Sequence, residues 1–334
     1  MRSPLRPREG ISATRLRAPG GNQTHSRQHE PVPATVRDWL SADFPDSREE
    51  LDYIVDPAGG GLVDENGRPV TLETPVTPGG FYFFHRVVPP EARVPFDVTV
   101  VHEDEHLLVV DKPHFLASTP NGRFVRECVV TRLRVERDEP DLVAIHRLDR
   151  VTAGLLILSR NPGTRGAYQR LFQDRKVDKT YEALAVLPGD FDPAAFPLEC
   201  ESRIEKDKGT RGVKEVDGPI NARSRIEFSH VVGTYEGDPV GRFVLTPHTG
   251  KTHQLRVHML GAGVPILGDP VYPHDLDQDP YDFSHPLRLC AVGLEFRDPL
   301  SGEERRFASR IKLSPNGAKG GADILLDSFG FMLL

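Results

Sequence analysis

Long hydrophobic runs are missing from this 334-residue chain. No uninterrupted apolar segment approaches the roughly 20 residues that a membrane-spanning helix needs. The arginine-rich first residues are not followed by the apolar core of a secretory signal peptide. We therefore expect a cytoplasmic protein without a membrane segment. The length allows about two domains of roughly 150 residues each.

Cysteine is also scarce. The chain has three cysteines without CxxC spacing: Cys128, Cys200 and Cys290. This argues against a disulfide framework and a zinc ribbon, so we expect buried structural thiols. Three histidines recur every five residues at His248, His253 and His258. That spacing is a poor helical repeat, and no cysteine or carboxylate stands at ligand spacing beside them, so we expect no bound metal.

An overall excess of positive charge is missing too. The formal net charge is -7, which argues against a uniformly basic coat for nucleic acid. The average hides a local excess, because residues 146–181 carry eight Lys or Arg against three Asp. A second basic cluster comprises Arg203, Lys206, Lys208, Arg211 and Lys214. A solvated surface would explain either cluster alone, but two of them flanking one candidate site favour a track for phosphates.

Proline and glycine divide the chain into segments. Residues 1–35 predict a flexible arm that has room for one short strand at residues 10–17. Residues 36–94 predict a small α+β module with a helix that begins at Val36, and prolines 89, 90 and 95 predict a linker at its end. Residues 311–334 form an unusually apolar tail, which we expect to dock on the protein.

The larger domain, residues 95–310, has mainly strand patterns. We predict a hairpin of residues 98–101 and 107–110, a strand at 155–158, and a helix after the Asn-Pro pair that follows it. Further strands are predicted at residues 179–186, 223–228, 242–246 and 289–296. The elements do not alternate regularly as in a doubly wound sheet, so the predicted fold class is α+β.

The most informative stretch is residues 146–158, His-Arg-Leu-Asp-Arg-Val-Thr-Ala-Gly-Leu-Leu-Ile-Leu. It places Asp149 between Arg147 and Arg150, directly before a predicted buried strand. Cationic neighbours favour the ionised form of a carboxylate, which suits nucleophilic or basic chemistry on an anionic polymer. A purely structural ion pair would produce the same pattern.

A second motif spans residues 247–258, Pro-His-Thr-Gly-Lys-Thr-His-Gln-Leu-Arg-Val-His. Its Gly-Lys-Thr is shared with the P-loop of NTPases, but that loop needs another glycine where this chain has Leu245. Without this glycine the backbone cannot wrap a triphosphate, so we expect no nucleotide cofactor. A glycine turn and a helix fit better, with Thr252 as N-cap and with His253 and Arg256 on one side.

Together these stretches resemble the RluA-type family of pseudouridine synthases. Residues 146–156 resemble the family signature, residues 179–181 (Lys-Thr-Tyr) its tyrosine motif, and residues 250–258 its arginine motif. Residues 103–113 and 265–270 also match in the expected order, and the resemblance covers about residues 95–310. Departures at Ala153 and Lys251 allow a different local RNA contact. The absence of a usual glycine within residues 113–120 indicates a particular subgroup with its own substrate.

The resemblance implies a pseudouridine synthase fold, which is a mixed, largely antiparallel β-sheet flanked by helices. It implies an isomerase that flips specific uridines out of ribosomal or transfer RNA and converts them to pseudouridine. RNA is then the expected partner, no cofactor is expected, and we expect a monomer. An RNA-binding protein of the same fold without turnover is the main alternative, and a P-loop NTPase is disfavoured by Leu245.

The resemblance also implies roles for individual residues. Asp149 is the essential carboxylate, which attacks the sugar, adds to the base or removes a ribose C2′ proton. Arg256 pairs with Asp149 through its guanidinium fork, and Tyr181 stacks on the uracil. The expected RNA contacts are Arg147, Arg150, Lys179, Lys251 and His253. Of these, Arg147 and Arg150 either clamp phosphates or fill the space of the extruded base.

The N-terminal module, residues 36–94, weakly resembles the S4-type RNA-binding module at its Asn66-Gly67 turn. Its helical region is acidic, with Asp38, Asp43, Asp46, Glu49 and Glu50. Acidic side chains are unsuited to holding phosphates. Packing or partner binding is therefore the alternative role of this module.

Overall fold

A computed structural model describes residues 3–45 and 48–316 of the chain. The chain divides into two compact units, one of Met1–Glu91 with Thr131–Pro140 and one of Ala92–Val130 with Asp141–Leu334. The apolar end of the tail, whose docking we predicted, lies outside the described residues. No helix in the described part of the chain is long and apolar enough to cross a membrane.

The smaller unit contains a three-stranded antiparallel sheet in the order β1-β3-β2. Its elements are β1 (Thr14–Arg17), α1 (Val36–Asp43), α2 (Arg48–Val55), β2 (Val63–Asp64) and β3 (Phe81–Phe84). Helix α1 begins at the predicted residue, because Thr35 and Asp38 form a capping box that satisfies free N–H groups at the helix start. Since β1 pairs along its whole length with β3, the structure places part of the predicted arm inside a sheet.

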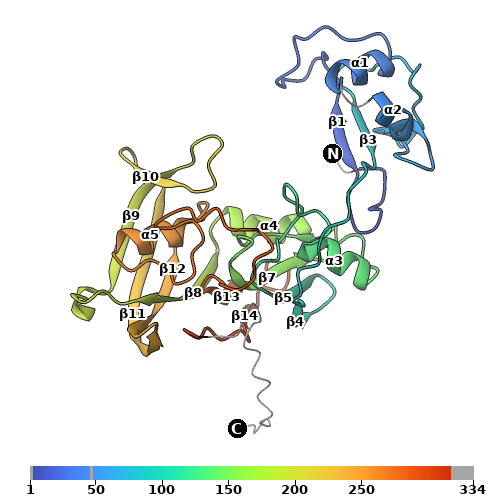
Figure 1. The fold of residues 1–334 in the computed structure, drawn as a ribbon. Coiled ribbons are helices and arrows are strands. Elements are labelled where there is room, and N and C mark those ends of the chain that lie inside the picture. Colours follow the sequence, from blue (N-terminus) through green and yellow to red (C-terminus); the bar gives the residue numbers. More distant parts are fainter. Residues whose placement is uncertain (1–2, 46–47, 317–334) are drawn as a thin grey trace. The chain divides into compact units, whose positions relative to one another are not determined.

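The larger unit is built on one 11-stranded sheet, with the path β10-β9-β11-β12-β8-β13-β7-β5-β4 and with β14 and β6 beside it (Figure 1). The strands are β4 (Thr99–Glu103), β5 (Leu107–Lys112), β6 (Val143–Ala144), β7 (Ala153–Ser159), β8 (Val177–Val186), β9 (Leu198–Glu205), β10 (Lys214–Val216), β11 (Ala222–Tyr235), β12 (Asp238–Pro247), β13 (Leu289–Arg297) and β14 (Glu304–Ala308). The helices are α4 (Arg165–Gln173), α5 (Gln254–Gly261) and the short 3₁₀ helix η1 (Pro193–Ala195), while α3 (Val129–Glu136) belongs mostly to the smaller unit.

The pairing is antiparallel except between β7 and β13, which confirms the α+β class and the largely antiparallel sheet. The predicted hairpin is β4 with β5, and the five other predicted strands are β7, β8, β11, β12 and β13. The predicted helix after β7 is α4. Strands β9, β10 and β14 were not predicted.

The parallel pair of β7 and β13 forms a narrow seam in the sheet. Only two residue pairs join them, Ala153 with Cys290 and Gly154 with Ala291. Gly154 has φ +109°, and a Cβ atom there would lie 2.3 Å from the carbonyl oxygen of Ala291. The seam therefore requires glycine at this position, directly after the Asp149 loop.

The cysteine prediction is confirmed at two positions and wrong at the third. Cys128 and Cys290 are buried. Cys200 is only half-buried, because it lies in β9, a strand near the edge of the sheet with alternating exposure.

Acid should destabilise the protein through His114. The His114 ring is 4% exposed, and its Nδ1 donates to the Val151 carbonyl at 2.9 Å. Burial lowers the pKa of His114 from 6.5 to about 4. Between pH 6.5 and 4 the unfolded chain therefore binds a proton that the folded chain does not. As the pH is lowered through this window, the free energy of unfolding should decrease by about 3 kcal/mol because of this group.

Urea unfolding at several pH values checks this expectation. His114→Gln can keep a donor to Val151 but cannot titrate, so its free energy of unfolding should depend less steeply on pH. The same change at exposed His274 is the control. Equal slopes for the wild type and His114→Gln would show that His114 does not cause the acid sensitivity.

Candidate active site

The loop before β7 holds Asp149 at the edge of a pocket. On one side of Asp149, the backbone of Leu148 makes two hydrogen bonds with the Ser118 hydroxyl, at 2.9 and 3.0 Å. The His146 ring stacks on Phe172 with centroids 4.5 Å apart, and its Nε2 accepts from the Ile157 N–H at 3.0 Å. These contacts fix the backbone around Asp149, while its own side chain remains 33% exposed.

Lys112 binds backbone carbonyl groups of the same loop and of the segment after β5. The residue is fully buried, and its Nζ donates to the carbonyl oxygens of Pro113, Leu116 and Arg150 at 2.9, 2.8 and 3.2 Å. Burial lowers the pKa of Lys112 to about 7, against the opposing effect of nearby Asp149. Sequence reasoning gave Lys112 no role, although it stands within the matching residues 103–113.

The turn before α5 is held by Gln254. Its side-chain oxygen accepts from the Thr249 hydroxyl at 2.7 Å and from the Lys251 N–H at 3.0 Å. Its amide nitrogen donates to the Arg223 carbonyl and the Ser224 hydroxyl. The predicted N-cap Thr252 is wrong, because the N-cap is His253, in a left-handed conformation with φ 53°. Gln254 satisfies the turn instead of a capping hydroxyl.

The guanidinium fork of Arg256 grips Asp269, which corrects the expected fork on Asp149. Arg256 Nε and Nη2 lie 2.7 and 2.6 Å from the two Asp269 oxygens, and both side chains are almost fully buried. Asp269 also accepts from the N–H groups of Val271 and Tyr272. The sequence gave no sign of this pairing beyond the presence of Asp269 in a matching motif.

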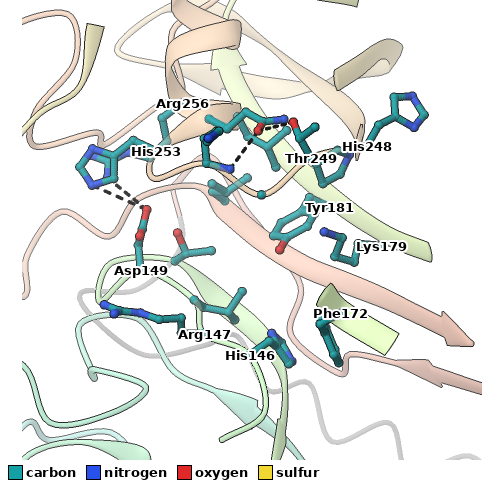
Figure 2. A pocket seen from close by; sticks show the side chains of 18 of the residues that line it. His146, Arg147, Asp149, Phe172, Lys179, Tyr181, His248, Thr249, His253 and Arg256 are labelled. Atoms are coloured by element: carbon teal, nitrogen blue, oxygen red, sulfur yellow. Dashed lines mark hydrogen bonds and ion pairs between the residues drawn. The ribbon is translucent and has the colours of Figure 1, made fainter. Parts of the chain in front are cut away.

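Asp149 is nevertheless close to Arg256 of α5 and to the N-cap residue His253. Asp149 Oδ2 lies 3.6 Å from Arg256 Nη1 and 3.8 Å from His253 Nε2. Figure 2 shows the Asp149 side chain directed towards this end of the pocket. The third nitrogen of Arg256 thus places a fixed positive charge beside the carboxylate, since the other two are bound to Asp269.

Tyr181 and Lys179 line the same pocket from β8, where residues two apart share one face of the strand. Tyr181 is held between Leu245 of β12 and Ala291 of β13. Burial, with the negative charge of Asp149, raises the pKa of Tyr181, so the phenol stays neutral. Burial lowers the pKa of Lys179. Leu245 is buried in strand β12. A P-loop would need a loop at this position, so the structure gives no support to that interpretation.

The pocket measures about 440 Å³, within the range of small-ligand sites. Its walls come from the Asp149 loop, α4, β8, the turn before α5 and the start of β13. They comprise Ile145, His146, Arg147, Leu148, Asp149, Thr152, Phe172, Gln173, Arg175, Lys179, Tyr181, Pro247, His248, Thr249, Gly250, Lys251, His253, Gln254, Leu255, Arg256 and Leu289. Among residues 3–45 and 48–316, no group of three or more His, Cys, Asp or Glu could hold a metal ion.

Comparison with known proteins gives the family. Residues 106–260 match the family model described as RNA pseudouridylate synthase. The dual-specificity RNA pseudouridine synthase RluA of Salmonella typhi is 33% identical over 216 residues, which cover 63% of this chain and 91% of that protein. RluA of Escherichia coli K12 is 34% identical over 179 residues, which cover 52% and 77% of the two chains. The chain belongs to the RluA family of RNA pseudouridine synthases.

A solved structure is also similar. Human RNA pseudouridylate synthase domain containing 1 has 25% identity and a TM-score of 0.48, over 64% of this chain and 82% of that chain. The pseudouridine synthase resemblance seen in the sequence is confirmed, and the protein is an RNA isomerase by family. The S4-like interpretation of residues 36–94 is not confirmed.

The pseudouridine synthase pocket brings together seven of the eight predicted site residues. Arg147 and Lys251 are exposed on its rim. The exception is Arg150, which is not among the lining residues. Its Nη1 donates to the carbonyls of Phe115 and Pro280, and its guanidinium lies over the Phe124 ring at 4.9 Å. The alternating charge pattern of the sequence could not show this packing.

The second basic cluster is largely neutralised in this pseudouridine synthase. Arg203, Arg211 and Lys214 form ion pairs with nearby carboxylates, Glu205, Asp275 and Asp207 respectively. Exposed pairs of this kind contribute little to stability. They reduce the local positive charge that the sequence alone indicated for a phosphate track.

Proposed function

We propose that this protein isomerises specific uridines of ribosomal or transfer RNA to pseudouridine, with Asp149 as the essential carboxylate. The observation that supports this best is the partly exposed Asp149 side chain, which lies in one pocket with the fixed Arg256 cation and the neutral Tyr181 phenol. The relatives named as dual-specificity enzymes favour a substrate search that covers more than one class of RNA.

The reaction needs little beyond these groups. The bond from ribose C1′ to uracil N1 breaks, the base turns, C1′ joins C5, C5 loses its proton and N1 gains one. Atoms and electrons are conserved within the nucleotide, so no external group is transferred. The target uridine must leave its stack to reach a carboxylate inside a pocket, and the pocket of about 440 Å³ would receive it.

Arg256 acts as a fixed counter-charge in this proposal. Because Asp269 holds its fork, Arg256 cannot close over both oxygens of Asp149. The Asp149 carboxylate therefore has a positive charge beside it but remains available to the nucleotide. This arrangement leaves the carboxylate free to attack the sugar, to add to the base or to remove the C2′ proton.

Tyr181 supplies the surface on which the uracil ring stacks, an interaction worth about 1–3 kcal/mol in comparable sites. Its neutral hydroxyl can also exchange a proton with the turning base. Arg147, Lys179 and Lys251 surround the pocket with positive charge and would hold the flanking phosphates. Arg150 would act on RNA only indirectly, by fixing the loop after Asp149.

Mapping pseudouridine in ribosomal and transfer RNA tests the proposal. RNA from cells that lack the gene should miss at least one pseudouridine, and the wild-type gene should restore it. Asp149→Asn should not restore the site, whereas Asp178→Asn should, because Asp178 is exposed on the other face of β8. If every site persists without the gene and the purified protein modifies no cellular RNA, the protein binds RNA without turnover.

A further inference from the structure

His253 and Asp149 face each other across a gap that neither side chain closes. His253 Nε2 lies 3.8 Å from Asp149 Oδ2, beyond the range of a hydrogen bond. The other ring nitrogen, Nδ1, lies 3.1 Å from the Tyr272 hydroxyl. The position of the ring proton therefore decides what His253 offers to the space beside Asp149.

Tyr272 determines that position. Its hydroxyl accepts from the Val213 N–H at 2.7 Å and donates to the Val213 carbonyl at 3.1 Å. A phenol has one proton, so a hydroxyl that donates to Val213 can only accept from His253. The opposite arrangement would take this donor from a buried carbonyl. His253 Nδ1 therefore carries the ring proton, and Nε2 presents a lone pair towards Asp149.

The ring is also neutral at physiological pH. Its side chain is 12% exposed. Burial, reinforced by the positive charge of Arg256, lowers the pKa of His253 to about 4, although Asp149 and Asp269 oppose this effect. An ionised carboxylate and a neutral Nε2 are both acceptors. A hydrogen-bond donor is the group that fits between them.

We propose that His253 Nε2 accepts a hydrogen bond from the ribose 2′-hydroxyl of the target nucleotide and so selects RNA over DNA. The proposal rests on the proposed function, in which Asp149 works beside the glycosidic bond. The 2′-hydroxyl stands on the carbon next to C1′, so it is the ribose donor closest to the reacting bond. With its proton directed to His253, the lone pairs of Asp149 stay free for the reaction.

The backbone of His253 is consistent with a dedicated position. Its φ of 53° and ψ of 17° are left-handed, a conformation that only a few per cent of non-glycine residues adopt, with His, Asn and Asp over-represented among them. The Tyr272 ring packs edge-on against His253, with centroids 5.8 Å apart, and the Arg256 guanidinium lies 5.2 Å from the same Tyr272 ring. Tyr272 thus holds both residues that border Asp149.

The tautomer can be measured on the full chain without RNA. Nitrogen-15 spectra of the histidine rings at pH 7 should show a protonated Nδ1 and an unprotonated Nε2 for His253, with the signals assigned by their loss in His253→Asn. Tyr272→Phe should remove this preference. A protonated Nε2 or a doubly protonated ring at pH 7 would overturn the proposal.

The selectivity test uses a stem-loop RNA with the mapped uridine as the ribo, 2′-deoxy or 2′-fluoro nucleotide. The fluoro form keeps an RNA-like sugar but removes the donor. Wild type should convert the ribo substrate at least about 10-fold faster than either analogue, a typical effect of an unpaired hydrogen-bonding group. Asn tolerates the left-handed backbone and keeps a donor for Tyr272. His253→Asn should therefore convert the ribo substrate more slowly and leave the rates of the two analogues unchanged, so that the ratio falls towards one.

The outcomes separate the two claims. Equal slowing of the ribo and deoxy reactions by His253→Asn would overturn the hydroxyl contact and leave the proposed function intact. His253→Gln, which can place an amide oxygen near the former Nε2, should have a higher ribo-to-deoxy ratio than His253→Asn. If the wild type converted none of the three substrates, the proposed function would fail, and the ribose contact with it, whatever the tautomer.

Discussion

Asp149→Asn is expected to abolish isomerisation while the protein still folds and binds RNA. Removal of a catalytic carboxylate should slow single turnover of the mapped RNA by at least about 1,000-fold. The isosteric amide cannot act as base or nucleophile. Its loss of charge removes one repulsion from phosphates, so the dissociation constant for RNA should stay within about threefold or become lower.

The stability cost of Asp149→Asn should be small. The Asp149 contact with Arg256 is 3.6 Å long and the carboxylate is 33% exposed, so the pair contributes about 0–1 kcal/mol. Single-turnover rates, RNA titrations and urea unfolding measure the three quantities on one preparation. A rate within tenfold of wild type would remove Asp149 from the chemistry. A large loss of stability would instead make it a structural residue.

Asp269→Asn is expected to cause the larger loss of stability. It leaves the buried Arg256 cation without its counter-ion, and removing one partner of such a pair costs about 3–5 kcal/mol. The new amide also places N–H groups against the guanidinium, which has no acceptor. Arg256, no longer held, can close on Asp149, and misplacement of this kind should lower the turnover rate by about 100-fold or more.

A paired variant distinguishes the two effects of Asp269. Arg256→Met combined with Asp269→Asn removes both charges while the amide oxygen still accepts from the N–H groups of Val271 and Tyr272, so most of the lost stability should return. Activity should not return, because Asp149 lacks its fixed cation. Urea unfolding and single-turnover rates of the single and double variants check this. If the double variant were as unstable as Asp269→Asn, the buried ion pair would not be the origin of the stability loss.

Local patterns in the sequence allowed much of the fold to be predicted. Continuous apolar residues predicted β5 and β7, because strands in the centre of a sheet are buried on both faces. The pattern that begins at Val36 predicted the start of α1, which the capping box of Thr35 stabilises. The short strands β10 and β14 escaped prediction because their alternating or polar residues resemble loops.

The sequence motifs predicted which side chains line the pocket. They did not predict the contacts that some of these side chains make with residues outside the motifs. Asp149, Tyr181 and Arg256 do meet at one pocket. The partner of the Arg256 fork, however, depends on a loop 13 residues further on. Arg150 is drawn away from the pocket by the Pro280 carbonyl, 130 residues further along the chain. Neither contact leaves a periodic signal in the sequence.

The narrow seam between β7 and β13 has a consequence for how the protein folds. Asp149 stands in the loop before β7, whereas Tyr181 lies in β8 on the far side of β13, and Arg256 lies in α5, which packs on β11 and β12. Contacts between residues so distant along the chain form slowly, because a long loop must close first. The pocket is complete only when the two parts of the sheet have joined at Gly154. Recovery of activity during refolding would therefore report the closure of the sheet, later than the formation of either part.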